Sequence, residues 1–329
     1  MLNANANMNT PYGSDVEGIN QLHAKNKQLL DEIRKVVIGQ DEVVKKVLIC
    51  IFSRGHCLLI GVPGLAKTLL VHTIAEALDL KFSRIQFTPD LMPSDITGSE
   101  ILNERKEFQF IPGPLFANIV LADEINRTPP KTQAALLEAM QERSITVGST
   151  MHKLQEPFFV LATQNPIEQE GTYPLPEAQL DRFMLNVILD YPRYEDELNI
   201  VRNTTSDIKT SVQKVISAEE ILHFQHLIRK VPVANNVLEY AVKLANKTRP
   251  SSPMAPDVVK NYVDWGAGPR ASQNLTIGAK CHAVLNGKYS PDIEDVQAVA
   301  HSVLRHRVVK NYKAEAEGLT VDEIINRIW

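Results

Sequence analysis

The feature that most constrains the fold is a series of five short apolar runs separated by polar or helical sequence. The runs CLLIG, FSRIQF, NIVLADE, FFVLATQN and FMLNVILD begin at residues 57, 82, 118, 158 and 183. Each run is long enough for a buried strand and too short for a typical helix. Helical patterns at 69–80 and 131–141 lie between them, the second with Thr128 as expected N-cap and Pro129 at its first position. Strands that alternate with helices predict an α/β fold whose parallel sheet is covered on both faces.

The rest of the chain has a different character. Residues 1–15 form a polar tail that we expect to be disordered, and residues 16–191 hold the α/β domain, which opens with helices near 16–34 and 41–52. The polar segment 192–217 is expected to be a connector with some helix. Helical patterns continue from 218 to 329 and predict a small all-helical domain. Two insertions, 98–116 and 143–155, contain turn residues between alternating polar and apolar positions, and this pattern predicts hairpins. Each hairpin could be a surface ribbon or a functional insert.

Composition excludes several classes of protein. Apolar residues make up 44% and charged residues 22% of the 329 residues, an ordinary globular mix. The net charge is −4 and no dense Lys/Arg block occurs, so we expect no nucleic-acid partner. Neither a signal peptide nor an apolar run of about 18 residues is found, so no membrane span is expected. The three scattered cysteines, Cys50, Cys57 and Cys281, fit no metal spacing and indicate reduced core thiols in a cytoplasmic protein.

The stretch GVPGLAKT follows the first apolar run and precedes a helical pattern, the context that a phosphate-binding loop requires. Its residues are Gly61, Val62, Pro63, Gly64, Leu65, Ala66, Lys67 and Thr68. Backbone N–H groups and the helix N-terminus would face the phosphates, Lys67 would reach the β- and γ-phosphates, and Thr68 would offer its hydroxyl to Mg²⁺. Ala66 replaces the usual glycine, which costs about 1–2 kcal/mol if positive φ is required there. The alternative is an ordinary strand-to-helix turn.

Polar residues end the third and fourth apolar runs. Asp123 and Glu124 follow the buried run NIVLA, where Asp123 can hold Mg²⁺ directly or through water and Glu124 can deprotonate an attacking water. Asn165 in ATQNP can hydrogen-bond the γ-phosphate or that water, unless it only forms a turn before Pro166. The bare acidic pair would be an ordinary surface feature elsewhere. Its position after the phosphate loop favours a catalytic role.

Two arginines complete the candidate site, Arg182 in PEAQLDRF and Arg270 in GAGPRA. An arginine near a transferring phosphoryl group neutralises the charge that develops in the transition state. Neither residue would be singled out alone, because surface arginines are common.

The order GVPGLAKT, LADEINR, ATQNP, LDRF and GAGPRA resembles the AAA+ ATPases, and its wording is closer still to the MoxR family, over about residues 33–308. MoxR-type loops share the alanine before the lysine. The resemblance implies a P-loop αβα core with a five-stranded sheet, a helical lid, and a ring, commonly a hexamer, with ATP between subunits. It assigns Lys67 and Thr68 to the Walker A motif and Asp123 and Glu124 to the Walker B motif. Asn165 matches sensor 1, Arg182 matches the arginine finger that acts on the neighbouring subunit, and Arg270 matches sensor 2. The adenine pocket would include Ile38, Gly39 and Gln40.

The resemblance also implies a function. It predicts a Mg²⁺-dependent ATPase that remodels or matures protein clients in a chaperone-like manner, with von Willebrand factor A-domain partners. The two hairpins resemble the helix-2 insert and the pre-sensor-1 hairpin, which line a pore or face the client, and Arg127 matches an arginine near the subunit interface. Three alternatives stay open: a metal-chelatase motor subunit, a nucleic-acid remodeller, and a nucleotide-gated scaffold without activity. The mixed charges of 98–116 disfavour a track for nucleic-acid phosphates.

Overall fold

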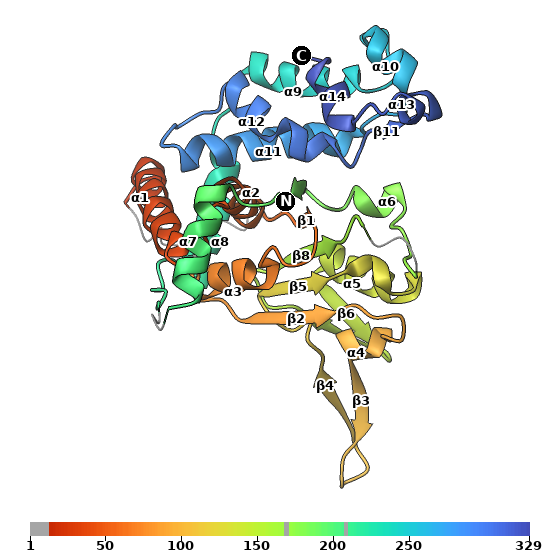
Figure 1. Ribbon diagram of the computed structural model, residues 1–329. Coiled ribbons are helices and arrows are strands. Elements are labelled where there is room, and N and C mark those ends of the chain that lie inside the picture. Colours follow the sequence, from red (N-terminus) through yellow and green to blue (C-terminus); the bar gives the residue numbers. More distant parts are fainter. Residues whose placement is uncertain (1–12, 168–170, 207–209) are drawn as a thin grey trace, which may run out of the picture.

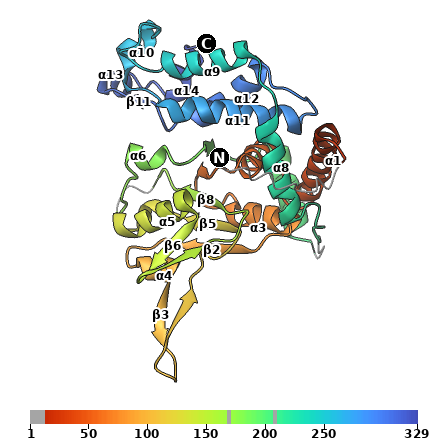
Figure 2. The same ribbon diagram turned by 180° about the vertical axis from the view of Figure 1, so that it is seen from behind.

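The computed structural model describes residues 13–167, 171–206 and 210–329 (Figure 1). The chain forms an α/β core with a layer of helices above it, and a long hairpin projects from the end of the core that lies away from those helices (Figures 1 and 2). Most of the predicted polar tail lies outside the described residues, and the first helix, α1, spans Asp15–Arg34. No helix in the described ranges has both the length and the apolar character needed to cross a bilayer.

Five parallel strands form the central sheet, in the order β2-β5-β8-β1-β9. They are the five apolar runs of the sequence: β1 (Cys57–Ile60), β2 (Phe82–Gln86), β5 (Ile119–Asp123), β8 (Phe159–Gln164) and β9 (Leu185–Ile188). Because all strands run in one direction, the segments that follow β1, β5 and β8 emerge at the same edge of the sheet. This edge collects the loop 61–66, the two acids and Asn165.

Helices cover both faces of the sheet. Successive side chains of a strand point to opposite faces, so Leu58 packs in one apolar cluster and Leu59 in the other. The cluster around Leu58 includes α5 (Pro130–Glu142), and the cluster around Leu59 includes α1, α2 (Asp41–Phe52) and α3 (Lys67–Ala77). The latter continues without a break into the upper helices, so the core and the lid share one apolar interior.

The start of α5 differs from the expectation. Pro129 is the N-cap and Pro130 occupies the first helical position, so the helix begins one residue later than predicted. Thr128 is extended (φ −112°, ψ 152°) and its buried hydroxyl has no hydrogen-bond partner in the described part of the chain. The prediction of Thr128 as N-cap was wrong. Proline is favoured at the first position of a helix, and because Pro129 and Pro130 both meet this preference, only the surrounding packing decides between them.

The lid is helical, as predicted. It contains α8 (Ala218–Lys230), α9 (Asn235–Lys247), α10 (Asp257–Tyr262), α11 (Pro269–Leu285), α12 (Ile293–Leu304), α13 (Tyr312–Ala316) and α14 (Val321–Asn326). It carries in addition a two-stranded ribbon of β10 (Val263–Trp265) and β11 (Val309–Lys310), which sequence periodicity did not indicate because the strands are so short. Another helix, α7 (Tyr194–Thr204), lies in the segment expected as a connector (Figure 1).

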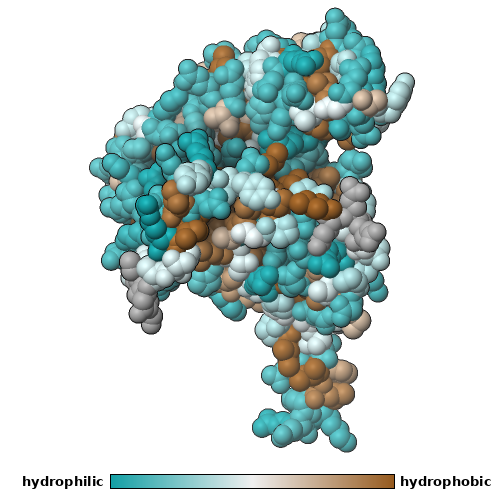
Figure 3. Space-filling model, viewed as in Figure 1, coloured by the Kyte–Doolittle hydropathy of each residue, from teal (hydrophilic) through white to brown (hydrophobic). Residues whose placement is uncertain are grey.

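Both predicted hairpins are present. The first pairs β3 (Gly98–Leu102) with β4 (Phe108–Pro112) and follows the short helix α4 (Pro93–Thr97), while the second pairs β6 (Ser144–Val147) with β7 (Thr150–Lys153). Phe110 stacks on His152 with 3.8 Å between ring centroids, which fastens one hairpin to the other. The projecting hairpin exposes apolar side chains to solvent (Figure 3), among them Leu102 and Phe108. The three cysteines are buried free thiols, as expected.

Candidate functional site

The loop 61–66 has the backbone of an anion cradle. Ala66 adopts the left-handed conformation (φ 53°, ψ 31°), so the positive φ considered for this position is required. Gly64 also has positive φ (87°), and a Cβ built there would meet no atom within 4 Å. The N–H groups of Gly64, Leu65 and Ala66 have no hydrogen-bond partner in the described part of the chain. Three backbone donors at the start of α3 are therefore without a partner among the described residues.

Lys67 and Thr68 form the first turn of α3, directly after this loop. The Lys67 ammonium is half-buried and donates a hydrogen bond to the Gly61 carbonyl oxygen. Burial lowers the pKa of Lys67, and the nearby charges of Asp123 and Glu124 oppose that shift. The structure thus brings the predicted lysine and the predicted acidic pair into one electrostatic cluster, from elements more than fifty residues apart in the chain.

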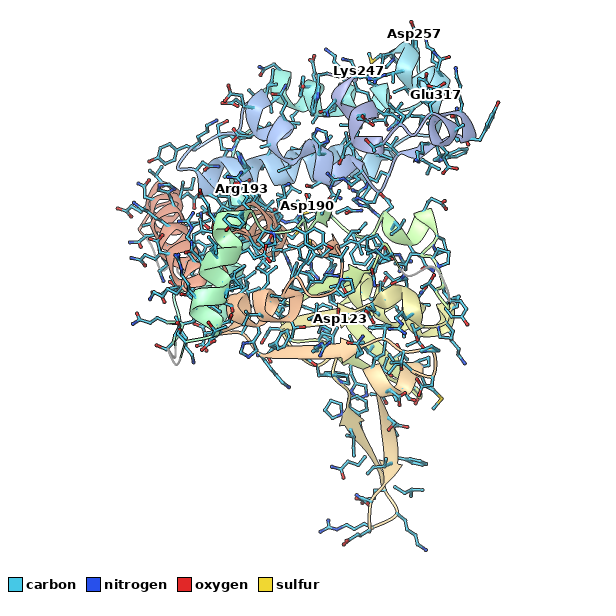
Figure 4. The ribbon with its side chains drawn as sticks, viewed as in Figure 1. Asp123, Asp190, Arg193, Lys247, Asp257 and Glu317 are labelled. Atoms are coloured by element: carbon cyan, nitrogen blue, oxygen red, sulfur yellow. The ribbon has the colours of Figure 1, made fainter. Side chains whose placement is uncertain are left out.

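Asp123 ends β5 within the core of the molecule (Figure 4). One of its carboxylate oxygens, Oδ1, accepts a hydrogen bond from the Thr163 hydroxyl at 2.7 Å. The other, Oδ2, accepts two hydrogen bonds from the Arg84 guanidinium, at 2.7 Å from Nη2 and 3.2 Å from Nε. Both oxygens of the Asp123 carboxylate are therefore already engaged by groups of the protein itself.

Glu124 follows in the left-handed conformation (φ 58°, ψ 49°), which turns the chain away from the strand. Its N–H donates to the Thr163 hydroxyl at 2.8 Å. Its carboxylate Oε2 accepts from Gln86 Nε2 at 2.8 Å and from Arg127 Nη1 at 3.1 Å. Gln86 also accepts from Arg84 at 2.6 Å, so one polar network connects both acids.

Asn165 lies at the same edge, directly after β8, and is buried. Its side-chain oxygen accepts from the Ile167 N–H at 3.1 Å, which leaves its amide NH₂ as the group able to donate to a ligand. The neighbouring Gln164 carbonyl accepts from the Gly61 N–H at 3.3 Å. The segment after β8 is therefore joined to the first residue of the loop.

The two predicted arginines, Arg182 and Arg270, contact other parts of the subunit than the phosphate loop. Arg182 Nη1 donates to the Leu137 carbonyl on α5 at 3.0 Å. Arg270 Nη1 forms an ion pair with Asp181 Oδ2 at 3.0 Å, across the boundary between core and lid. Within the described residues, neither guanidinium has a recorded contact with Lys67 or with the acidic pair.

A cavity of about 350 Å³ adjoins the loop. Ile38, Gln40 and the loop residues Gly64, Leu65 and Ala66 line one side, and α7 lines the other through Ile200, Asn203 and Thr204. Gly39 is not among the lining residues. Its φ is +76°, and a Cβ there would come within 2.9 Å of the Asp196 side chain, so this glycine lets α7 approach. Figure 4 shows Asp190 and Arg193 where the chain leaves the sheet and enters α7.

Comparison with known proteins identifies the family. A profile of the ATPase family associated with various cellular activities (AAA) matches residues 56–185, and one of the AAA lid domain matches 257–328. Chaperone MoxR1 of Mycobacterium tuberculosis is 42% identical over 90% of this chain and 79% of its own length. The uncharacterized protein YeaC of Bacillus subtilis is 41% identical over 93% of this chain and 94% of its own length. The chain is a MoxR-type AAA+ ATPase.

A solved structure agrees with this assignment. The crystal structure of a protein from Cytophaga hutchinsonii, described as a candidate ATPase, superposes on the MoxR-type chain with a TM-score of 0.89 and 45% identity, and covers 95% of each chain. The P-loop αβα fold with a helical lid is thereby confirmed.

Sequence reasoning missed two parts of the site of this MoxR-type ATPase. Arg84 and Gln86 of β2 contact the acidic pair, and α7 closes one side of the cavity. A signal for the first was present, because the run FSRIQF carries polar residues at alternate positions of a strand expected to be buried. The segment of α7 gave no such signal, since none of its described residues is buried and its sequence is that of a polar surface helix.

Proposed function

We propose that this ATPase binds ATP with Mg²⁺ at the loop 61–68 and hydrolyses the γ-phosphate by attack of water. The observation that carries the proposal is the cluster of the Lys67 ammonium with Asp123 and Glu124, beside three unpaired backbone donors. Hydroxyl and carboxylate oxygens are ligands that Mg²⁺ prefers, so Thr68 and Asp123 would hold the ion. When bound, Mg²⁺ neutralises negative charge on the phosphate oxygens.

The side chains of the chain itself would then act as follows. Lys67 leaves the Gly61 carbonyl and donates to phosphate oxygens instead. Glu124 accepts the proton of the attacking water at Oε1, because the hydrogen bonds from Gln86 and Arg127 both go to Oε2. Asn165 donates its amide N–H to the γ-phosphate or the water. The cavity lined by Ile38, Gln40 and α7 would take the adenine base, because its walls are mainly apolar with a few polar groups.

The assignment of the base is tested with Glu124→Gln. This variant keeps the size of the side chain but cannot accept the proton, so we expect ATP binding within about two-fold of the parent and turnover reduced by about 100-fold or more. Glu219→Gln, an exposed glutamate on α8, is the matched control and should keep the parent rate. Phosphate release by Glu124→Gln at the parent rate would contradict the assignment.

We further propose that the active form is a ring, commonly a hexamer in this family, in which Arg182 acts on the ATP of the neighbouring subunit. The contact of Arg182 with α5 of its own core, rather than with its own loop, supports this. Arg182→Ala and Glu124→Gln should each be inactive, whereas an equal mixture should regain activity at about a quarter of the interfaces. Mixed rings that form and show no regain would rule out action in trans. Arg270 would serve as sensor 2 after leaving Asp181.

Chaperone-like remodelling of protein clients in the cytoplasm, with von Willebrand factor A-domain partners, is the use that we propose for this turnover. The relative from M. tuberculosis is named a chaperone, and the hairpin of β3 and β4 exposes the apolar side chains that client contact needs, including Phe108 at 72% exposure. Phe108→Ser should leave basal ATP turnover unchanged and abolish its stimulation by client. Equal stimulation of this variant and the parent would exclude the hairpin as the client contact.

A further inference from the structure

A second cavity is distinct from the cavity beside the phosphate loop. It has a volume of about 490 Å³ and opens between α1 and α2 of the core and α11 and α12 of the lid. Its lining residues include Asn26, Lys27, Arg34, Lys45, Lys46 and His282, and they share none with the cavity beside the loop. We propose that this cavity is a binding site for a small phosphomonoester that also carries a hydroxyl group.

Four cationic side chains line this cavity, and two of them are neutralised within the protein. Arg34 forms ion pairs with Asp41 at 3.0 Å and with Asp31 at 3.2 Å. Lys45 forms an ion pair with Glu42 at 2.7 Å. Such pairs near the surface compensate charge locally and leave little attraction for a ligand.

The other two cations have no direct partner. In the described part of the chain, neither Lys27 nor Lys46 has a hydrogen-bond or ion-pair partner. Lys46 is half-buried, and burial together with the charge of Arg305 lowers its pKa, although the more distant charges of Glu42 and Asp322 oppose the shift. A lysine that is partly desolvated without a partner is costly, and an anion in the cavity would offset that cost.

A buried amide adds a second and independent requirement. Asn26 is only 7% exposed, and its side-chain oxygen has no hydrogen-bond partner. Its NH₂ group donates to the Leu285 carbonyl at 3.4 Å, so the side-chain oxygen is the atom of this amide left without a hydrogen-bond partner among the described residues. A buried acceptor without a donor is uncommon in native proteins, so a ligand group that donates a hydrogen bond is expected beside it.

These two requirements define the ligand class. A phosphate monoester concentrates between one and two negative charges in one group at neutral pH, which matches two free ammonium groups. A hydroxyl on its carbon skeleton would donate to Asn26. The cavity volume is in the range typical of small-molecule sites, about 300–1,000 Å³.

The position of the cavity gives such a ligand a mechanical consequence. Lys27 belongs to α1, Lys46 belongs to α2, and Leu285 ends α11 of the lid, so the ligand would contact core and lid at once. His23 already joins α1 to the lid through a 3.0 Å hydrogen bond with the Leu285 carbonyl. A bound phosphomonoester would therefore stabilise this arrangement of core and lid. The proposal concerns binding and does not depend on ATP hydrolysis.

Isothermal titration calorimetry on the full chain tests the site, with glycerol 3-phosphate as the probe. A saturating non-hydrolysable ATP analogue and Mg²⁺ are present so that the phosphate of the probe cannot enter the loop 61–68. We expect saturable binding to the parent, and about ten-fold or more weaker binding to Lys27→Met and Lys46→Met, because each loses one charge-assisted contact. Lys260→Met, an exposed lysine of α10 without a recorded ion pair, should bind like the parent.

Methyl phosphate, which carries no hydroxyl, should bind at least several-fold more weakly than glycerol 3-phosphate. Lys27 is exposed, so its variant folds even if Lys46→Met does not. The absence of heat with glycerol 3-phosphate up to millimolar concentration would overturn the proposal. Binding that is equal in the parent and both lysine variants would also overturn it, since the ligand would then lie elsewhere.

Discussion

Arg84 is predicted to compete with Mg²⁺ for Asp123. Its guanidinium donates twice to Asp123 Oδ2, while the Thr163 hydroxyl occupies Oδ1, so both carboxylate oxygens are engaged. An ion held by Asp123 must therefore displace Arg84 or share the carboxylate with it. Arg84→Met keeps most of the aliphatic stem of the side chain and removes only the competing charge.

The magnitude follows from the exposure of the two partners. The Asp123 side chain is 13% exposed, but that of Arg84 is 46% exposed, so solvent screens the pair. An ion pair of this kind contributes about 1 kcal/mol. Removing that competition should tighten the Mg²⁺-dependent part of nucleotide binding by about five-fold. Binding in EDTA should change by less than two-fold.

The measurement is a titration of a non-hydrolysable ATP analogue into the protein, with Mg²⁺ at several concentrations and with EDTA. Arg105→Met, an exposed arginine in the turn of the projecting hairpin, is the matched control and should behave as the parent. Unchanged Mg²⁺ dependence in Arg84→Met would refute the competition. Weaker binding both with Mg²⁺ and with EDTA would show instead that Arg84 binds phosphate directly.

Three further predictions concern stability. Ala66→Gly relieves the left-handed alanine and should stabilise the protein by about 0.5 kcal/mol in urea unfolding, whereas Ala24→Gly in the exposed part of α1 should cost about 1 kcal/mol. Arg307, whose side chain is 2% exposed, forms an ion pair with Asp181 at 2.7 Å. Asp181→Asn leaves this buried guanidinium with neutral acceptors only, so the free energy of unfolding should fall by about 2 kcal/mol or more. Burial lowers the pKa of His56 from 6.5 to about 4, because the folded state favours the neutral imidazole. Between pH 6.5 and 4 the unfolded chain therefore binds a proton that the folded chain does not. The free energy of unfolding should fall by about 1.4 kcal/mol for each pH unit as the pH drops through this range.

Each of these predictions has a control or a contradicting outcome. Destabilisation by Ala66→Gly would contradict the strain argument. Asp79→Asn breaks an exposed pair with Lys214 and should cost much less than Asp181→Asn, so equal costs would refute the buried-charge argument. His56→Gln should flatten the acid limb of the stability profile, while His226→Gln, an exposed histidine, should leave its slope unchanged.

The sequence by itself determined the elements and the identity of the loop. Strand and helix periods and the order of GVPGLAKT, LADEINR and ATQNP are local patterns, because each depends on neighbours within one turn or one strand. The roles predicted for Asp123 and Asn165 require both residues to lie near the loop, and the parallel strands of the structure do deliver their carboxyl ends to one edge. The positive φ considered at Ala66 was likewise a local property of a strand-to-helix turn.

Only the tertiary structure decided which side chains meet. Arg84 contacts Asp123 because β2 lies beside β5 in the sheet, and strand order is not encoded in either segment alone. Arg270 of α11 and Arg307, in the turn after α12, converge on Asp181, and α7 closes the cavity although its own sequence is that of a surface helix. These contacts join residues far apart in the chain, and their free energy depends on burial and geometry that arise only when the layers pack.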